Sequence, residues 1–218
     1  MESIQGKRAL FITAADLRAR LTGYQQILID LGTGDGRFVE HIARVRPDCF
    51  AIGVDACREN LRQASRRTLR NTLYCIANVL ALPAELRDLA TDVTINFPWG
   101  SLLAGLLAGD AVLLRGVAAL ARPGARLTVQ LNSGALAEAD WTLSEGAAQI
   151  RQQLIVGGFT VDQPIGLDAG ALRQVPTTWA KRLAFGRDPR GVVLTGKKLG
   201  AANWPLPRFT FQARIILV

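Results

Sequence analysis

The sequence predicts an α/β domain whose sheet is mostly parallel. Hydrophobic runs of strand length alternate with helical patterns along most of the chain. The 218 residues, 49% of them hydrophobic, are enough to bury one sizeable core. We therefore expect a single domain over residues 1–199, which leaves residues 200–218 as a C-terminal tail of unknown role.

The first half of the domain is predicted to alternate strands with helices. Residues 1–24 form an N-terminal extension, where Gly6-Lys7 favours a hairpin turn before a helix. Pro47 ends the first strand–helix unit, and Pro83 suits the first position of a short helix. The expected elements are a helix at 14–21, a strand at 27–31, a helix around 38–43, a strand at 49–55, a helix at 58–69, a strand at 73–77 and a short helix at 83–89.

The second half continues this alternation until a long connection interrupts it. Gly109 predicts a break in an otherwise helical stretch, and Gly157-Gly158 closes a later helix. The expected elements are a strand at 92–97, helix over 102–120, a strand at 126–131, a helix at 144–156, and strands at 159–165 and 192–198. Residues 166–191 remain as a connection, and a loop of that length in a compact domain is usually functional.

The charge of the chain indicates a polyanionic partner. Lys and Arg number 26 against 18 acidic residues, which gives a net charge of +8 and a pI near 10.2. Such a balance favours nucleic acid first and an anionic membrane second. No apolar run reaches the roughly 18 to 20 residues that cross a bilayer. Cys49, Cys57 and Cys75 form no CxxC pair, so we expect reduced thiols, no metal site and a cytoplasmic location.

A glycine-rich turn follows the first predicted core strand and gives the strongest local signal. Gly32, Gly34 and Gly36 lie where this strand passes into a helix, and glycines let a backbone approach a ligand closely. A dinucleotide site would have a third glycine at position 37, where this chain has Arg, although a nicotinamide dehydrogenase remains the main rival. The carboxylates of Asp30 and Asp35 would repel a pyrophosphate, which favours a cationic ligand without phosphate.

This turn resembles motif I of the Rossmann-like class I methyltransferases. Asp55, 21 residues after Gly34, also suits the acid that accepts hydrogen bonds from ribose hydroxyls. The resemblance implies S-adenosylmethionine as cofactor and a seven-stranded, mostly parallel sheet with the last strand antiparallel and helices on both faces. It assigns cofactor contacts to residues of the first three strand ends, namely Asp30, Gly32, Thr33, Gly34, Asp35, Asp55, Ala77 and Asn78.

Two tryptophans occur in segments that should face the methyl donor. Trp99 follows the strand predicted at 92–97, and Trp179 lies in the long connection. Ligands of such sheets bind outside the carboxyl ends of the strands, and two indoles there would suit a flat base that has been flipped out of its helix. A tryptophan considered alone would more often be a core or hinge residue.

The segments around both tryptophans resemble the aminoglycoside-resistance methyltransferases that modify N1 of adenine 1408 in 16S ribosomal RNA. The resemblance runs from about residue 5 to residue 198 and rests on the segments 97–103 and 177–187 and on the glycine turn. It implies that Trp99 and Trp179 sandwich the flipped adenine and that Pro98 and Thr177 help to form the pocket. The implied partner is the 30S subunit.

Two other functions remain open at this point. One is methylation of another RNA base, such as guanine N7 of tRNA or an adenine amino group. Asn96-Phe97-Pro98-Trp99 lacks the second proline typical of the amino methyltransferases. The other is a non-catalytic RNA-binding module, which the intact residues Asp30 and Asp55 argue against.

Basic side chains are candidates for RNA contact. Arginines that are spaced by four residues from Arg58 share one helix face, which in an ordinary protein would simply be solvated. The net charge and the predicted base pocket favour phosphate contact instead. The expected RNA-binding residues are Arg62, Arg66, Arg67, Arg70, Lys181, Arg182 and Arg187. Adenine N1 carries a free lone pair, so we expect no catalytic acid or base, and we expect the protein to act as a monomer.

Overall fold

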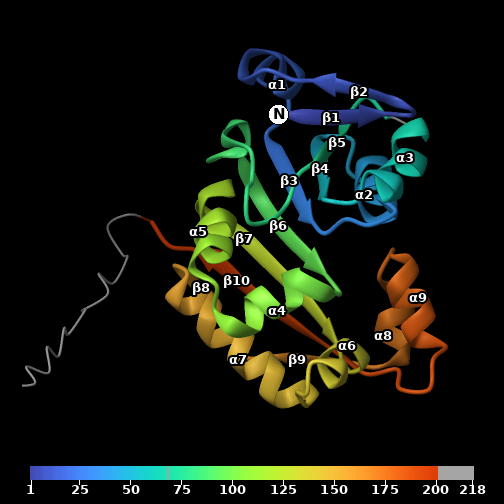
Figure 1. Ribbon diagram of the computed structural model, residues 1–218, viewed down its shortest axis with the longest axis vertical. Helices are drawn as coiled ribbons and strands as arrows, with labels where there is room; N and C mark the ends of the chain where they lie inside the picture. Colours follow the sequence, from blue (N-terminus) through green and yellow to red (C-terminus); the bar gives the residue numbers. More distant parts are fainter. Residues whose placement is uncertain (68, 201–218) are drawn as a thin grey trace, which may run out of the picture.

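The computed structural model describes residues 1–67 and 69–200, so the predicted tail lies almost wholly outside the described residues. The described residues form one ten-stranded sheet with helices packed against it (Figure 1). The strand order is β2-β1-β5-β4-β3-β6-β7-β10-β8, and β9 pairs with β10.

The elements alternate along the chain much as the hydrophobic pattern predicts. The strands are β1 (Glu2–Gln5), β2 (Arg8–Phe11), β3 (Gln26–Leu31), β4 (Cys49–Asp55), β5 (Thr72–Ile76), β6 (Ala90–Asn96), β7 (Ala121–Asn132), β8 (Phe159–Val161), β9 (Ile165–Leu167) and β10 (Gly191–Lys198). The helices are α1 (Ala14–Leu21), α2 (Arg37–Val45), α3 (Arg58–Ala64), α4 (Gly100–Ala108), α5 (Ala111–Leu120), α6 (Ser133–Glu138), α7 (Leu143–Val156), α8 (Ala169–Gln174) and α9 (Thr178–Ala184). Short 3-10 helices occur at η1 (Ser65–Arg67) and η2 (Ala84–Leu86).

The centre of the sheet confirms the predicted fold class. Strands β5, β4, β3, β6 and β7 run parallel to one another, while β10 is antiparallel to both β7 and β8 and β1 is antiparallel to β5. The five parallel strands together with β10 and β8 are the seven that the resemblance implies. The sheet nevertheless has ten strands rather than seven, because the N-terminal hairpin β1–β2 extends it past β5 and because β9 adds a short pairing to β10.

Several boundaries differ from the sequence prediction for local reasons. The strand expected at 159–165 is divided into β8 and β9, with Pro164, which has no N–H to donate, just before β9. The helix expected at 58–69 ends at Ala64 and continues as η1, where the Ser65 hydroxyl accepts a hydrogen bond from the Gly6 amide at 3.0 Å. The helix expected at 83–89 is only the single turn η2.

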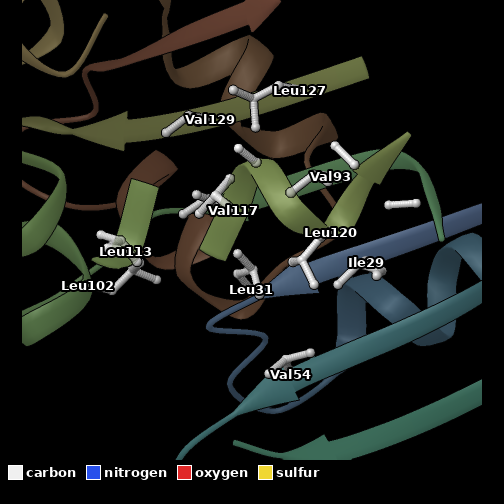
Figure 2. Packing of buried hydrophobic residues seen from close by; sticks show 14 of the residues in the cluster. Ile29, Leu31, Val54, Val93, Leu102, Leu113, Val117, Leu120, Leu127 and Val129 are labelled. Atoms are coloured by element: carbon white, nitrogen blue, oxygen red, sulfur yellow. The ribbon is translucent and has the colours of Figure 1, made fainter. Parts of the chain in front are cut away.

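The sheet packs helices on both faces, and alternate residues of β3 illustrate this. Leu28 points into a cluster that contains Val39 of α2 and Leu61 of α3. Ile29 and Leu31 point to the other face, into a larger cluster with α4, α5 and α7, and all of these side chains are almost fully buried. Figure 2 shows part of the larger cluster, where β3, β6 and β7 meet the two helices α4 and α5.

The break predicted near Gly109 separates α4 from α5. Gly109 ends α4 with a φ of 67°, and the two helices are bent by 101° relative to each other. Together they have the length and hydropathy of a broken membrane span, whereas no single described helix is long and apolar enough to cross a membrane. Leu106 and Leu113 of this pair are fully buried in the core cluster.

The fold places a crevice at the carboxyl ends of β3 and β6. The helix that follows β3 packs on one face of the sheet and the helix that follows β6 packs on the other. Ligands of parallel α/β sheets bind at such a topological switch point. The long connection predicted at 166–191 folds into β9, α8 and α9, and α8 and α9 lie beside each other at this side of the molecule (Figure 1).

Candidate active site

A cavity of about 470 Å³ lies at the carboxyl ends of β3, β4 and β6. It combines the glycine turn after β3 with the start of α4 and the start of α9. A volume of this size is in the range of small-molecule and cofactor sites. The lining residues are Asp30, Gly32, Thr33, Gly34, Asp35, Phe38, Asp55, Ala56, Asn60, Asn78, Val79, Asn96, Phe97, Pro98, Trp99, Ser101, Leu102, Thr177, Thr178, Trp179 and Arg182.

The glycine turn needs its glycines for two different reasons. Gly32, Gly34 and Gly36 all have φ between 56° and 70°, a region that favours glycine. A Cβ at Gly36 would lie 2.5 Å from Cβ of Ala64 and 2.7 Å from Cε1 of Tyr74. A Cβ at Gly34 would meet nothing within 4 Å, so this position leaves open space toward the cavity.

Asp30 is a buried carboxyl group at the end of β3. One carboxylate oxygen, Oδ1, accepts hydrogen bonds from Thr94 Oγ1 at 2.7 Å and from Asn96 Nδ2 at 2.9 Å, both in β6. Burial raises the pKa of Asp30 to about 6, although these hydrogen bonds oppose the shift. A cationic group bound in the cavity would favour the ionised form of this acid.

Asp55 joins the end of β4 to the glycine turn. Its Oδ2 accepts a hydrogen bond from the Gly34 amide, and its Oδ1 accepts one from the Cys57 amide, each at 2.8 Å. A carboxylate has about four lone-pair sites. Asp55 therefore supports the shape of the turn and keeps acceptor capacity for hydroxyl groups in the cavity.

The end of β5 contributes less than the sequence predicts. Asn78 lines the cavity, and its side-chain oxygen accepts a hydrogen bond from the Leu80 amide at 2.9 Å. Ala77 does not line the cavity. Its amide instead donates to the carbonyl of Asp55 at 3.1 Å, and the lining residue on this segment besides Asn78 is Val79.

The two tryptophans stack on each other at the mouth of the cavity. The ring centroids of Trp99 and Trp179 lie 5.7 Å apart, with 15° between the ring planes. The side chains are 43% and 47% exposed, so they are not core residues. Pro98 and Thr177 line the cavity beside them, and the Thr177 hydroxyl also caps α9 by accepting from the Ala180 amide at 2.9 Å.

The predicted basic residues fall into two groups. Near the tryptophans, the Arg182 guanidinium lies 5.5 Å from the centroid of the Trp179 ring, and Lys181 and Arg187 are exposed. On α3 and beyond it, Arg66 and Arg70 are exposed and Arg62 is half-buried. Arg67 is in η1, but its side chain lies outside the described part of the structure.

Sequence reasoning missed one polar connection in the site. The Thr178 hydroxyl donates a hydrogen bond to Asp35 Oδ2 at 2.6 Å, across 143 residues of sequence. The sequence also predicted no role for Asn96, whose side-chain amide donates a hydrogen bond to Asp30, or for Phe97, which packs against α8 and α9. Among the described residues, no group of three His, Cys, Asp or Glu side chains could hold a metal ion.

Comparison with known proteins identifies the family. The sequence model of NpmA, described as 16S rRNA (adenine(1408)-N(1))-methyltransferase, matches residues 2–198. A curated protein of that name from Escherichia coli is 32% identical over 205 residues, which cover 84% of this chain and 92% of the relative. The chain belongs to this methyltransferase family.

Comparison with solved structures supports the same family assignment. The antibiotic-resistance methyltransferase Kmr is 34% identical with a TM-score of 0.77, and the match covers 92% of this chain and 99% of Kmr. The 16S rRNA methyltransferase KamB is 28% identical with a TM-score of 0.83, over 92% of this chain and all of KamB. The family and the fold that the sequence predicts are therefore confirmed.

Proposed function

We propose that this methyltransferase transfers a methyl group from S-adenosylmethionine to N1 of adenine 1408 in the 16S rRNA of the 30S subunit, and that the modification confers aminoglycoside resistance. The observation that supports this most directly is the exposed, stacked pair of Trp99 and Trp179 beside an acid-lined cavity. Two indoles at the mouth of such a cavity suit a flat base brought next to a methyl donor.

The residues of the cavity fit S-adenosylmethionine better than a dinucleotide. Asp30, Asp35 and Asp55 put three carboxylates on the cavity wall, which suits a cationic ligand and would repel a pyrophosphate. We assign Asp30 to the amino group of the methionine part, and Asp55 to the ribose hydroxyls. The bound cofactor would supply a methyl group on a positively charged sulfur, which is already electrophilic.

The chain then needs to supply positioning rather than acid–base chemistry. Neutral adenine attacks through the N1 lone pair, so no side chain has to remove a proton first. The product base carries a positive charge, and the indole faces of Trp99 and Trp179 would stabilise it by about 0.5–2 kcal/mol. Holding N1 in line with the methyl group supplies the larger part of the rate enhancement.

The tryptophan pair has to open before a base can enter. Stacked atoms are in contact at about 3.5 Å, so a base between two rings needs about 7 Å between the outer ring planes. The centroids of Trp99 and Trp179 are 5.7 Å apart. The two rings must therefore separate by about 1 Å or more when a base binds between them.

The basic residues on α3, η1 and the end of α9 are proposed to contact RNA phosphates. Arg66 also lines a smaller hollow of about 290 Å³, together with Asp35 and Arg37, directly beside the main cavity. A net charge of +8 supports association with a structured RNA surface. We expect the protein to act as a monomer in the cytoplasm, where 30S subunits are found.

Methyl transfer to purified ribosomal subunits tests the proposal. The protein is incubated with S-adenosylmethionine labelled in the methyl group and with 30S subunits, 50S subunits or tRNA. Label should enter 30S subunits, and reverse transcription should stop next to adenine 1408 because a methyl group at N1 blocks base pairing. Transfer to tRNA with none to 30S subunits would contradict the proposal and favour methylation of another RNA base.

A further inference from the structure

A hydrogen bond connects the glycine turn to the helix that carries Trp179. Thr178 is the first residue of α9, and its hydroxyl donates to Asp35 Oδ2 at 2.6 Å. This length is typical of a hydroxyl bound to an ionised carboxylate, which is a strong type of hydrogen bond. The neighbouring Thr177 uses its own hydroxyl oxygen to cap α9, so the two threonines have different partners.

The helices α8 and α9 form a small packing unit of their own. Leu172 and Val175 from α8 and its end pack with Ala180 and Ala184 from α9 in a cluster separate from the two main cores. Phe97 from the end of β6 enters this cluster, two residues before Trp99. The unit that carries Trp179 is therefore attached to the loop of Trp99 by apolar packing.

Asp35 provides a second attachment, from the side of the proposed methyl donor. It lies in the glycine turn, lines the cavity and holds Thr178, whose backbone is covalently joined to Trp179. Arg37 Nε lies 3.3 Å from the same Asp35 oxygen, but the Arg37 side chain is 60% exposed. Of these two partners, only Thr178 connects Asp35 to the tryptophan pair.

We propose that Asp35 is a positioning residue that acts through Thr178: it sets the place of Trp179 and couples occupancy of the methyl-donor turn to closure of the base pocket. This inference rests on the proposed function. A donor bound against the turn would hold Asp35 in place, and Asp35 through Thr178 would keep α9 and Trp179 beside the donor while the two rings part to admit the base. Because coupling between two binding sites is reciprocal, the 30S subunit must raise the affinity for the donor by the same factor.

Thr178→Val is the decisive variant, because valine keeps the branched shape and removes the hydroxyl. Thr178→Ser keeps the hydroxyl and serves as the conservative rescue, and Arg37→Ala removes only the exposed partner of Asp35. Three quantities are measured for each protein: the Kd for S-adenosylmethionine by calorimetry with and without 30S subunits, kcat and KM for methyl transfer, and the exciton signal of the stacked indoles in circular dichroism.

We expect Thr178→Val to bind the donor alone within about twofold of the unchanged protein, since the cavity acids are intact. Its kcat should fall about tenfold, the value of a lost hydrogen bond to a charged group. The indole exciton signal should weaken, and the subunits should no longer improve donor affinity. Thr178→Ser and Arg37→Ala should retain both the signal and the coupling.

An unchanged indole signal together with unchanged coupling in Thr178→Val would overturn the inference. A loss of donor affinity in Thr178→Val without subunits, equal to that in their presence, would also overturn it, because Thr178 would then act only on the cofactor site. The indole signal is measured without RNA. It therefore tests the role of Asp35 even if the unchanged protein does not methylate adenine 1408, which is the outcome that would refute the proposed function alone.

Discussion

Replacing Asp30 by asparagine should stabilise the protein and at the same time weaken donor binding. Asp30 is 1% exposed, and its pKa is raised from 3.8 to about 6 because burial penalises the charged form. Each pKa unit corresponds to about 1.4 kcal/mol, so the ionised group costs the folded protein about 3 kcal/mol near neutral pH. The amide oxygen of the introduced asparagine can still accept from Thr94 and Asn96 without carrying that charge.

The pH dependence gives this prediction a clear sign. The folded protein binds the Asp30 proton more tightly than the unfolded chain, so the stability that Asp30 contributes is lost as the pH rises from about 4 through 6. The advantage of Asp30→Asn should therefore be largest above pH 6 and should shrink toward zero near pH 4. At neutral pH it amounts to about 5–10 °C in Tm for a domain of this size.

Urea unfolding at pH 8 and at about pH 4 measures this effect, with Asp140→Asn as a control for loss of one exposed carboxylate. Calorimetry with S-adenosylmethionine should show at least a tenfold loss of affinity in Asp30→Asn, because an ionic hydrogen bond is removed. Equal stability changes at both pH values would refute the argument from burial. Unchanged donor affinity would refute the role of Asp30 at the amino group.

Three further changes test separate parts of the site. Trp99→Ala should reduce methyl transfer roughly 100-fold, since one stacking face is lost, while calorimetry should find donor binding within about twofold of normal. Arg66→Glu combined with Arg70→Glu should weaken 30S binding. The negative slope of log affinity against log salt concentration should become shallower by about 2, because two phosphate contacts are lost. Gly36→Ala should destabilise the protein by about 2–5 kcal/mol in urea unfolding, since its Cβ would clash with Ala64 and Tyr74, whereas Gly34→Ala meets no such atoms and should cost about 1–2 kcal/mol.

Each of these expectations has an outcome that contradicts it. Full activity in Trp99→Ala would remove the stacking proposal, and Trp99→Phe should retain part of the activity because a smaller aromatic face remains. Unchanged subunit affinity in the double arginine variant would make those side chains an ordinary solvated surface; Arg18→Glu with Arg20→Glu on α1 provides the matched change of charge. Equal destabilisation by the two glycine variants would show that backbone conformation, not the clash, decides the cost.

The sequence predicted the central strands well because their signals are local. Strand β4 occupies the predicted residues 49–55, which form an unbroken apolar run before the polar Asp55. The helix after it was predicted too long, because Ser65 makes a tertiary hydrogen bond with Gly6 that no local pattern reveals. The division of β8 from β9 does have a local signal, because Pro164 lies just before β9 and has no N–H to donate to a neighbouring strand.

The site residues that could be predicted from the sequence are those whose side chains have a distinctive chemistry, such as carboxylates and indoles. The structure brings Asp30, Asp55 and both tryptophans to one cavity, as expected from their places at strand ends. Ala77 does not line the cavity, because the turn that follows β5 decides which backbone groups of this segment face the cavity. The hydrogen bond between Thr178 and Asp35 could not be predicted from the sequence. The two residues are 143 positions apart, and no sequence motif links a threonine and an aspartate at that separation.

The mutual stacking of Trp99 and Trp179 also bears on which bases the proposed pocket would favour. Contact between two aromatic rings is worth about 0.5–1.5 kcal/mol, and an entering base must replace it with two contacts of its own. A purine covers both indole faces broadly, whereas a pyrimidine with a single ring recovers less of what is displaced. If the two rings hold the flipped base as proposed, their mutual contact offsets part of the stacking energy that any base gains, and the part that remains is larger for a purine than for a pyrimidine.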